Sequence, residues 1–231
     1  MTGMPPSVQI PGFSRKDCHP HDMLWLRPGT LARGQSLPPW VKAYHTDDMP
    51  VIVRRDHAED GRIPAGIRGK RRSERAATWI HPQDIIHKRS PEDIIAKLKM
   101  QETLPFSGMK PIQAIEQLLN ENIPEPWGVT GSCAFALATG RNVMHAGSDL
   151  DLLIRCPEAV NRELFRNLAD RLSSLPCRTD IQIETPEGAF SLKEWMRPDN
   201  RQVLLKTDFG PLLTENPWHL TQKEKAQQWT E

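Results

Sequence analysis

The sequence has few cysteines, no long apolar run and almost no net charge, and each shortage excludes a class of protein. The four cysteines, at positions 18, 133, 156 and 177, form no Cys-x-x-Cys pair and have no histidine at zinc-site spacing, so we expect free thiols. No run approaches the ~20 apolar residues that span a bilayer, and Met1 to Phe13 lacks the charged flank and apolar core of a signal peptide. A net charge of +1 gives no reason to expect bulk binding to nucleic acid. We therefore expect a cytoplasmic protein that binds neither a membrane nor nucleic acid.

The chain is predicted to form two domains. Its 21 prolines, about twice the usual share, predict long irregular connections in the first half. Short apolar runs at Met23–Leu26 and Val51–Val53 predict strands of a small, mostly β N-terminal domain over residues 15–80. From Ser90-Pro91-Glu92-Asp93 onward the pattern changes, because this segment combines an N-cap serine, a proline at the first helical position and acids in the first turn.

Residues 86–231 are predicted to form an α/β (α+β) catalytic domain with a mixed sheet and flanking helices. A helix is expected to follow Pro111, and another to open at Pro157 with Val160, Leu164, Phe165, Leu168 and Leu172 facing the core. The expected strands are Trp127–Val129, Leu150–Ile154, Arg178–Glu184 and Gln202–Lys206.

Two aspartates, Asp149 and Asp151, form the first candidate for chemistry. Side chains alternate across a strand, so both carboxylates project from one face, ~7 Å apart, while Leu150, Leu152 and Ile154 project from the other. Two like charges this close repel each other. Mg²⁺ would relieve the repulsion, because it favours carboxylate oxygens together with substrate phosphates. The pair therefore predicts a divalent-metal site.

A third carboxylate is expected from the strand Arg178–Glu184. Ile181 and Ile183 are expected to face the core, so Asp180, Gln182 and Glu184 share the polar face. Asp180 is the preferred third ligand, because a neighbouring strand could bring it beside the pair, and Glu184 is the alternative.

Gly131-Ser132, after a short strand and before a helix, is a candidate phosphate site. Glycine lets a backbone approach closely, the free amides of a helix start bind phosphate, and Ser132 adds a hydroxyl. Phosphate bound here, with metal held by the aspartates, suits an in-line displacement at phosphorus. The other candidates for substrate binding are Ser148, Arg68, Arg71, Arg72 and Arg75.

The combination Gly131-Ser132, Asp149-Leu150-Asp151 and Asp180 resembles the nucleotidyltransferase superfamily of the polymerase-beta type. The resemblance implies the mixed sheet of that superfamily. One departure is the interval of 16 residues between Ser132 and Asp149, which is longer than is usual there. We expect a loop around residues 139–145 to take up the extra length.

A closer resemblance, to malonate decarboxylase holo-acyl-carrier-protein synthase, also called phosphoribosyl-dephospho-CoA transferase, covers most of the chain. It implies transfer of 2'-(5''-triphosphoribosyl)-3'-dephospho-CoA to a serine of the acyl-carrier subunit, release of diphosphate, and catalytic roles for Asp149 and Asp151. It also implies that Asp180 completes the metal site or accepts the serine proton. The segments that carry the resemblance are His21-Asp22-Met23-Leu24-Trp25-Leu26, Ala65-Gly66-Ile67-Arg68-Gly69, Trp127-Gly128-Val129-Thr130-Gly131-Ser132 and His145 to Leu153.

Two rival functions stay open at this point: another Mg²⁺-dependent nucleotidyltransferase that uses ATP, and a non-catalytic module that binds a carrier protein or a nucleotide. The carrier of citrate lyase is an alternative acceptor. Cys133 follows Ser132 directly, but no histidine pairs with it in the sequence, so we do not expect a nucleophilic cysteine.

Overall fold

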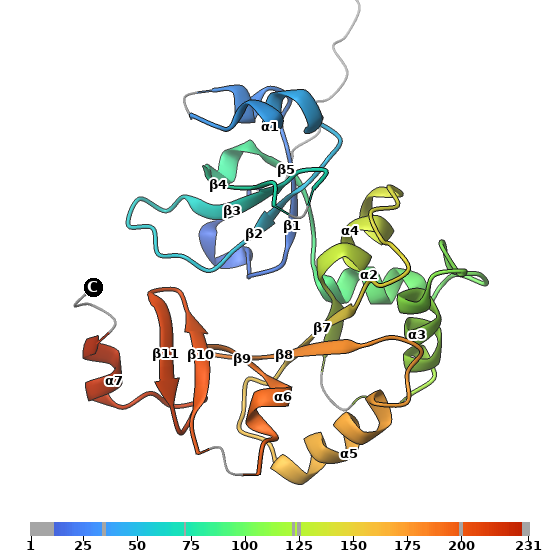
Figure 1. The fold of residues 1–231 in the computed structure, drawn as a ribbon. Helices are drawn as coiled ribbons and strands as arrows, with labels where there is room; N and C mark the ends of the chain where they lie inside the picture. The colour runs from blue at the N-terminus through green and yellow to red at the C-terminus, as the bar shows by residue number, and fades with distance from the viewer. Residues whose placement is uncertain are drawn as a thin grey trace, which may run out of the picture. The chain divides into compact units, whose positions relative to one another are not determined.

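The chain divides by its internal contacts into two compact units (Figure 1). The first comprises Met1–Arg54 and Ala58–Lys88, and the second comprises Arg55–His57 and Arg89–Glu231. The assignment of domains to residues 15–80 and 86–231 stays a prediction. The computed structural model describes residues 12–33, 36–71, 73–121, 123, 126–198 and 201–227.

The first unit is built on a five-stranded sheet. The predicted strands Met23–Leu26 and Val51–Val53 are confirmed, and they pair antiparallel with Leu24 opposite Val51. Both side chains are fully buried, as expected for the inner face of a half-buried sheet. A short helix, α1 (Pro39–Tyr44), contributes the buried Val41 to the same core. In sheet order the strands are β4 (Arg75–Ile80), β3 (Ile63–Arg68), β2 (Val51–Val53), β1 (Met23–Leu26) and β5 (Ile85–Arg89).

The second unit contains a six-stranded mixed sheet. In this sheet β7 and β8 run parallel, and the other pairs of neighbouring strands are antiparallel. This confirms the mixed sheet predicted for this part of the chain. In sheet order the strands are β11 (Gly210–Thr214), β10 (Val203–Thr207), β9 (Gly188–Ser191), β8 (Thr179–Thr185), β7 (Leu150–Arg155) and β6 (Trp127–Val129).

The helix start predicted at Ser90 is confirmed. The Ser90 hydroxyl accepts a hydrogen bond from the Asp93 amide (3.0 Å), and the Asp93 carboxylate accepts one from the Ser90 amide (2.8 Å), which completes a capping box. The helix packs against β6 at Gly128, where a Cβ atom would lie 2.6 Å from the Pro91 carbonyl oxygen. The helices of the unit are α2 (Pro91–Leu98), α3 (Lys110–Leu119), α4 (Gly131–Thr139), α5 (Arg162–Leu172), α6 (Leu192–Trp195) and α7 (Gln222–Gln227).

The start predicted for α5 at Pro157 is wrong. The helix begins at Arg162, because the Asn161 side chain accepts a hydrogen bond from the Glu163 amide (2.9 Å) and so caps the first turn. Val160 therefore lies outside the helix, and Leu164 is 40% exposed instead of facing the core. The buried stripe consists of Phe165, Leu168 and Leu172, which are three and four residues apart.

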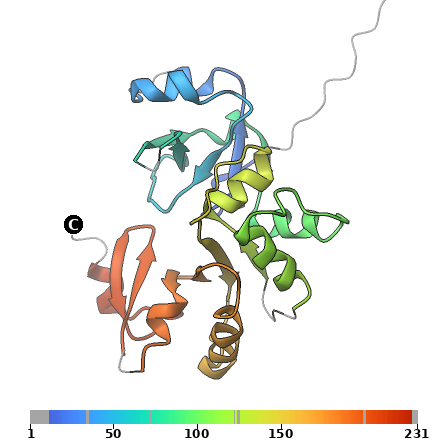
Figure 2. The same cartoon turned by 45° about the vertical axis from the view of Figure 1, so that its right-hand side comes forward.

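Helices cover both faces of the second sheet (Figures 1 and 2). Gly128 lies opposite Leu153 across the β6–β7 pair, so α2, which packs on Gly128, covers the face that carries Leu153 and Asp151. In both views α4 lies beside α2, and α5 and α6 lie on the opposite face. In the described part of the chain, no helix combines the length and apolar character needed to cross a membrane.

Candidate active site

The parallel pairing of β7 and β8 brings the candidate acids together. Asp151 is the register partner of Asp180, and partners in neighbouring strands lie ~4.8 Å apart with side chains on the same face. Asp149, one residue before β7 and two before Asp151, belongs to that face as well. The predicted neighbouring strand therefore places Asp180, and not the alternative Glu184, beside the aspartate pair.

Glu184 lies further along β8 and forms an ion pair with Arg55. Glu184 is the register partner of Arg155. It follows Asp180 by four residues, a distance of ~13 Å along a strand. Its carboxylate forms an ion pair with Arg55 of the same unit at 2.5 Å, with both side chains largely buried. Glu184 therefore balances a buried cation away from the aspartates.

Asp151 also touches the glycine–serine turn. Gly131 has φ +64°, and a Cβ atom there would collide with Oδ2 of Asp151 and lie 2.9 Å from its Cγ. The backbone amide of Thr130 donates to the carbonyl oxygen of Asp151 (2.9 Å). Glycine is thus required at position 131 for its backbone conformation and for the close approach of the carboxylate.

The amides at the start of α4 stand next to this carboxylate. Thr130 occupies the N-cap position, and within the described residues its side chain makes no capping hydrogen bond. The first amides of a helix have no partner inside the helix and attract anions. The turn at Gly131 and Ser132 therefore meets the requirements of a phosphate site immediately beside the acidic strand.

Ser148 closes the turn that precedes Asp149. Its side chain is buried, its hydroxyl accepts a hydrogen bond from the His145 amide (2.9 Å), and its amide donates to the His145 carbonyl (2.9 Å). The Gly147 amide donates to Nδ1 of His145 (3.1 Å). The turn therefore has internal bonds that fix the position from which Asp149 projects, while the predicted contact between Ser148 and substrate stays a prediction.

Arg178 is a candidate that the sequence analysis missed. Its guanidinium lies 3.4 Å from the Asp149 carboxylate, and the two side chains are 75% and 39% exposed. An ion pair this open to water adds little to stability, so both groups remain accessible to a ligand. The signal was present in the sequence, because Arg178 stands two residues before Asp180 and alternation puts both on one face.

Cys133 has the properties of a structural thiol. Burial, with smaller contributions from the neighbouring Cys177 and Asp151, raises its pKa to about 12. Burial likewise raises the pKa of Cys177. A thiol acts as a nucleophile through its thiolate, which supports the expectation that Cys133 is not one.

The predicted phosphate-binding arginines lie in the first unit. Arg68 ends β3 and is the register partner of Arg75 at the start of β4, and Arg71 lies in the connection between them. Arg72 lies outside the described residues. The acidic strand belongs to the second unit, so the role of these arginines in phosphate binding stays a prediction.

Comparison with known proteins identifies the family. The models of the phosphoribosyl-dephospho-CoA transferase MdcG N-terminal and C-terminal domains match residues 19–91 and 95–217. The chain belongs to this family of transferases. The resemblance found in the motifs is thereby confirmed, as is the prediction that the protein is an enzyme.

Curated members of the phosphoribosyl-dephospho-CoA transferase family match over most of their length. The protein of that name from Klebsiella pneumoniae (strain 342) is 44% identical over 200 residues, which cover 87% of this chain and 96% of the relative. The one from Pseudomonas putida (strain GB-1) is 38% identical, covering 86% and 94%. The one from Pseudomonas syringae pv. tomato is 32% identical, covering 88% and 94%. No solved structure matches the chain significantly, so the polymerase-beta-type fold stays a prediction.

The acidic residues of this transferase fit a hard cation only in part. In the described residues, no group of three or more His, Cys, Asp or Glu side chains is arranged to hold a metal ion. Two carboxylates, however, are what Mg²⁺ commonly takes from a protein when phosphate oxygens and water supply its other ligands. Asp149 and Asp151 provide that donor set on one face of one strand.

Proposed function

We propose that the protein transfers 2'-(5''-triphosphoribosyl)-3'-dephospho-CoA to a serine of the acyl-carrier subunit of malonate decarboxylase, with release of diphosphate. Membership of the phosphoribosyl-dephospho-CoA transferase family supports the donor. The single observation that carries the mechanism is the contact of Asp151 with Gly131, because it joins an acidic strand to a phosphate-binding turn.

The phosphate groups of the donor are bound at the start of α4. The backbone amides of Gly131 and Ser132 face the β- and γ-phosphates, and the Ser132 hydroxyl adds a donor. Arg178, with its guanidinium 3.4 Å from Asp149, neutralises the charge that grows on the departing diphosphate. Asp149 and Asp151 would hold Mg²⁺, which lowers the energy of the charged oxygens at the reacting phosphorus.

The chemical step is an in-line displacement. The hydroxyl oxygen of the carrier serine forms a bond with the α-phosphorus, and the bond from this phosphorus to the bridging oxygen breaks. Diphosphate leaves with the electron pair of that bond. Asp180, exposed and in register with Asp151, accepts the proton of the serine.

Mass spectrometry of an apo carrier subunit tests the proposal. Incubation with the protein, Mg²⁺ and triphosphoribosyl-dephospho-CoA should raise the carrier mass by that of the phosphoribosyl-dephospho-CoA group. A carrier with its serine replaced by alanine should stay unmodified. Diphosphate released from ATP alone would reject the proposal in favour of an ATP-dependent nucleotidyltransferase, and no reaction with either donor would favour a binding module. The apo carrier of citrate lyase, run in parallel, identifies the acceptor.

Asp149→Asn tests the acidic pair. The substitution keeps the size of the side chain and removes its charge, and we expect transfer to fall by at least 10³-fold, about 4 kcal/mol of transition-state stabilisation. Asp170→Asn, at an exposed position on α5, is the matched control and should leave the rate unchanged. Equal rates for the two variants would remove Asp149 from the mechanism.

A further inference from the structure

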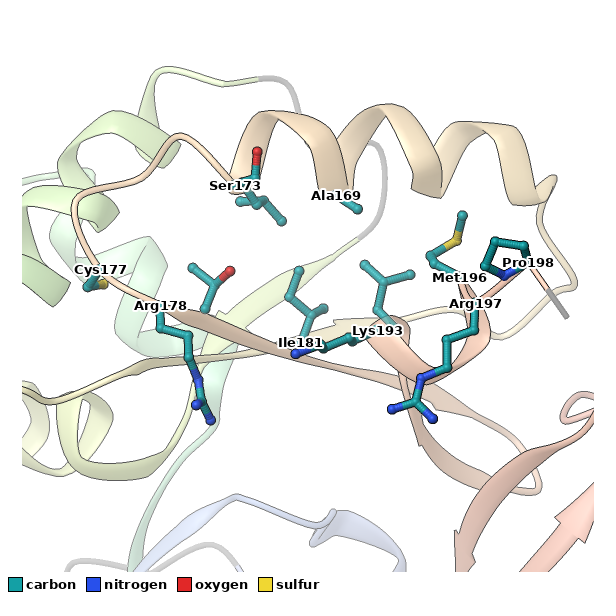
Figure 3. A pocket seen from close by; sticks show the side chains of 12 residues that line it. Ala169, Ser173, Cys177, Arg178, Ile181, Lys193, Met196, Arg197 and Pro198 are labelled. Atoms are coloured by element: carbon teal, nitrogen blue, oxygen red, sulfur yellow. The ribbon is translucent and has the colours of Figure 1, made fainter. Parts of the chain in front are cut away.

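A cavity of about 570 Å³ lies in the second unit between α5, α6 and the first residues of β8 (Figure 3). Its volume falls within the range of roughly 300–1,000 Å³ that is typical of small-molecule sites. Ile181, on the face of β8 opposite Asp180, points into the space below α5. The apolar lining is completed by Ala169, Leu172, Leu192, Met196 and Pro198.

The wall of the cavity is held in place from both sides. Arg162, at the start of α5, donates hydrogen bonds to the carbonyl oxygens of Trp195 and, at 3.2 Å, of Arg197. The ring of Phe165 packs edge-on against Trp195, with centroids 5.6 Å apart. These contacts therefore tie together the two elements that flank the cavity.

Cations border the cavity. Arg178, Lys193 and Arg197 are exposed, and in Figure 3 the side chains of the two arginines point away from α5. None of the described residues that line the cavity is acidic, and none is aromatic. The chemistry suits a flexible, largely apolar chain attached to phosphate groups, and it offers a nucleobase no ring on which to stack.

The cavity and the acidic site have one residue in common, Arg178. Arg178 lines the cavity and also lies 3.4 Å from Asp149, and the neighbouring Thr179 lines it one residue before Asp180. A donor with its triphosphate at the acidic strand therefore has an apolar space on the opposite face of β8, and Arg178 is close to both. The only long, flexible, uncharged part of the dephospho-CoA moiety is its pantetheine arm, which is linked to adenosine through a diphosphate.

We propose that this cavity binds the pantetheine arm of the donor, with Lys193 and Arg197 on the diphosphate. The inference rests on the proposed function, and it assigns to the α5–α6 cavity a recognition role separate from the chemistry at Asp149 and Asp151. It predicts that the arm contributes to affinity without taking part in the transfer.

Binding of two commercial ligands to the full chain separates the arm from the rest of the donor. Dephospho-CoA contains the arm, and ADP is the same molecule without it. By isothermal titration calorimetry, we expect Ala169→Leu, which fills the cavity from α5, to weaken dephospho-CoA binding at least tenfold and to leave ADP binding unchanged. Asn167→Leu, on the exposed side of α5, is the matched control and should change neither affinity.

Two further variants keep the inference testable if Ala169→Leu does not fold. Ser173→Phe, at an exposed position on the cavity wall, should produce the same selective loss. Arg197→Glu, which reverses a charge beside the cavity, should weaken both ligands at least fivefold. Unchanged dephospho-CoA binding in the filled variants would overturn the inference, as would failure of dephospho-CoA to bind more tightly than ADP to the unsubstituted protein. The proposed function can also fail while this inference holds. In that case the carrier subunit stays unmodified, but dephospho-CoA binding still depends on the cavity as described.

Discussion

Replacing Gly131 with alanine tests how closely the turn and the acidic strand must fit. The substitution introduces two costs. The φ of +64° belongs to the left-handed region, where an L-residue costs about 1–2 kcal/mol. The new Cβ would also lie 2.9 Å from Cγ of Asp151, whereas carbon atoms rest at roughly 3.5–4.0 Å, so the carboxylate must retreat by about 1 Å.

The two costs have different consequences. The backbone cost should lower the free energy of unfolding by about 1–2 kcal/mol. Displacement of a catalytic group by about 1 Å should reduce the transfer rate about 10²-fold. Urea unfolding measures the first effect, and the initial rate of carrier modification, followed by mass spectrometry, measures the second.

Gly140→Ala provides the matched control at the other end of α4. Gly140 has φ +72°, and a Cβ atom there would meet nothing within 4 Å. This variant should lose a similar free energy of unfolding and keep its transfer rate. If Gly131→Ala and Gly140→Ala are equally active, the contact between Asp151 and the turn plays no part in the reaction.

Three further perturbations test separate parts of the structure. Arg178→Ala should reduce the transfer rate ten- to hundredfold, and Arg178→Lys should restore part of the rate. Because the ion pair of Arg178 is exposed, Arg178→Ala should change the free energy of unfolding by less than about 1 kcal/mol. Equal transfer rates for the unsubstituted protein and both variants would refute this role. Ser90→Ala removes the cap of α2 and should cost about 1 kcal/mol in urea unfolding with no change in rate. Burial raises the pKa of Cys133 from 9.0 to about 12, so the unfolded chain loses this proton first. The associated stability is complete below pH 9 and falls as the pH rises toward 12, by up to about 1.4 kcal/mol per pH unit. Unfolding between about pH 8 and about pH 11 should therefore show a steeper loss for the unsubstituted protein than for Cys133→Ala, and identical slopes would contradict the assignment.

The elements that could be predicted from sequence are those whose local signals are strong. The capping residues of Ser90-Pro91-Glu92-Asp93 and the apolar spacing of Ile112, Ile115 and Leu118 depend on the chain within a few residues, and the corresponding helices were found. The strand of Asp151 was found for the same reason, because alternation is a local property. The start of α5 was predicted wrongly at Pro157. Both a proline and a capping asparagine such as Asn161 are common at helix starts, so the local sequence does not decide between them.

The arrangement of the site depends on contacts that no local pattern encodes. The pairing of Asp151 with Asp180 is set by the register of two parallel strands whose connection contains a whole helix. The proximity of Asp151 to Gly131 and of Arg178 to Asp149 follows from that register and from the path of the chain after β6. Strand β5 was not predicted, because its solvent-facing residues Ile86 and His87 give no alternation.

The hydrogen bond from the Thr130 amide to the Asp151 carbonyl has a consequence for how this protein can diverge. This bond holds the start of α4 next to β7. The residues from Arg141 to His145 therefore form a loop between two segments whose positions are already fixed. Doubling the length of such a loop costs only about 0.6 kcal/mol in chain entropy. The long interval between Ser132 and Asp149 therefore does not disturb the arrangement of Gly131 and the two aspartates. Insertions or deletions in this loop should be tolerated, whereas the added methyl group of Gly131→Ala should not be.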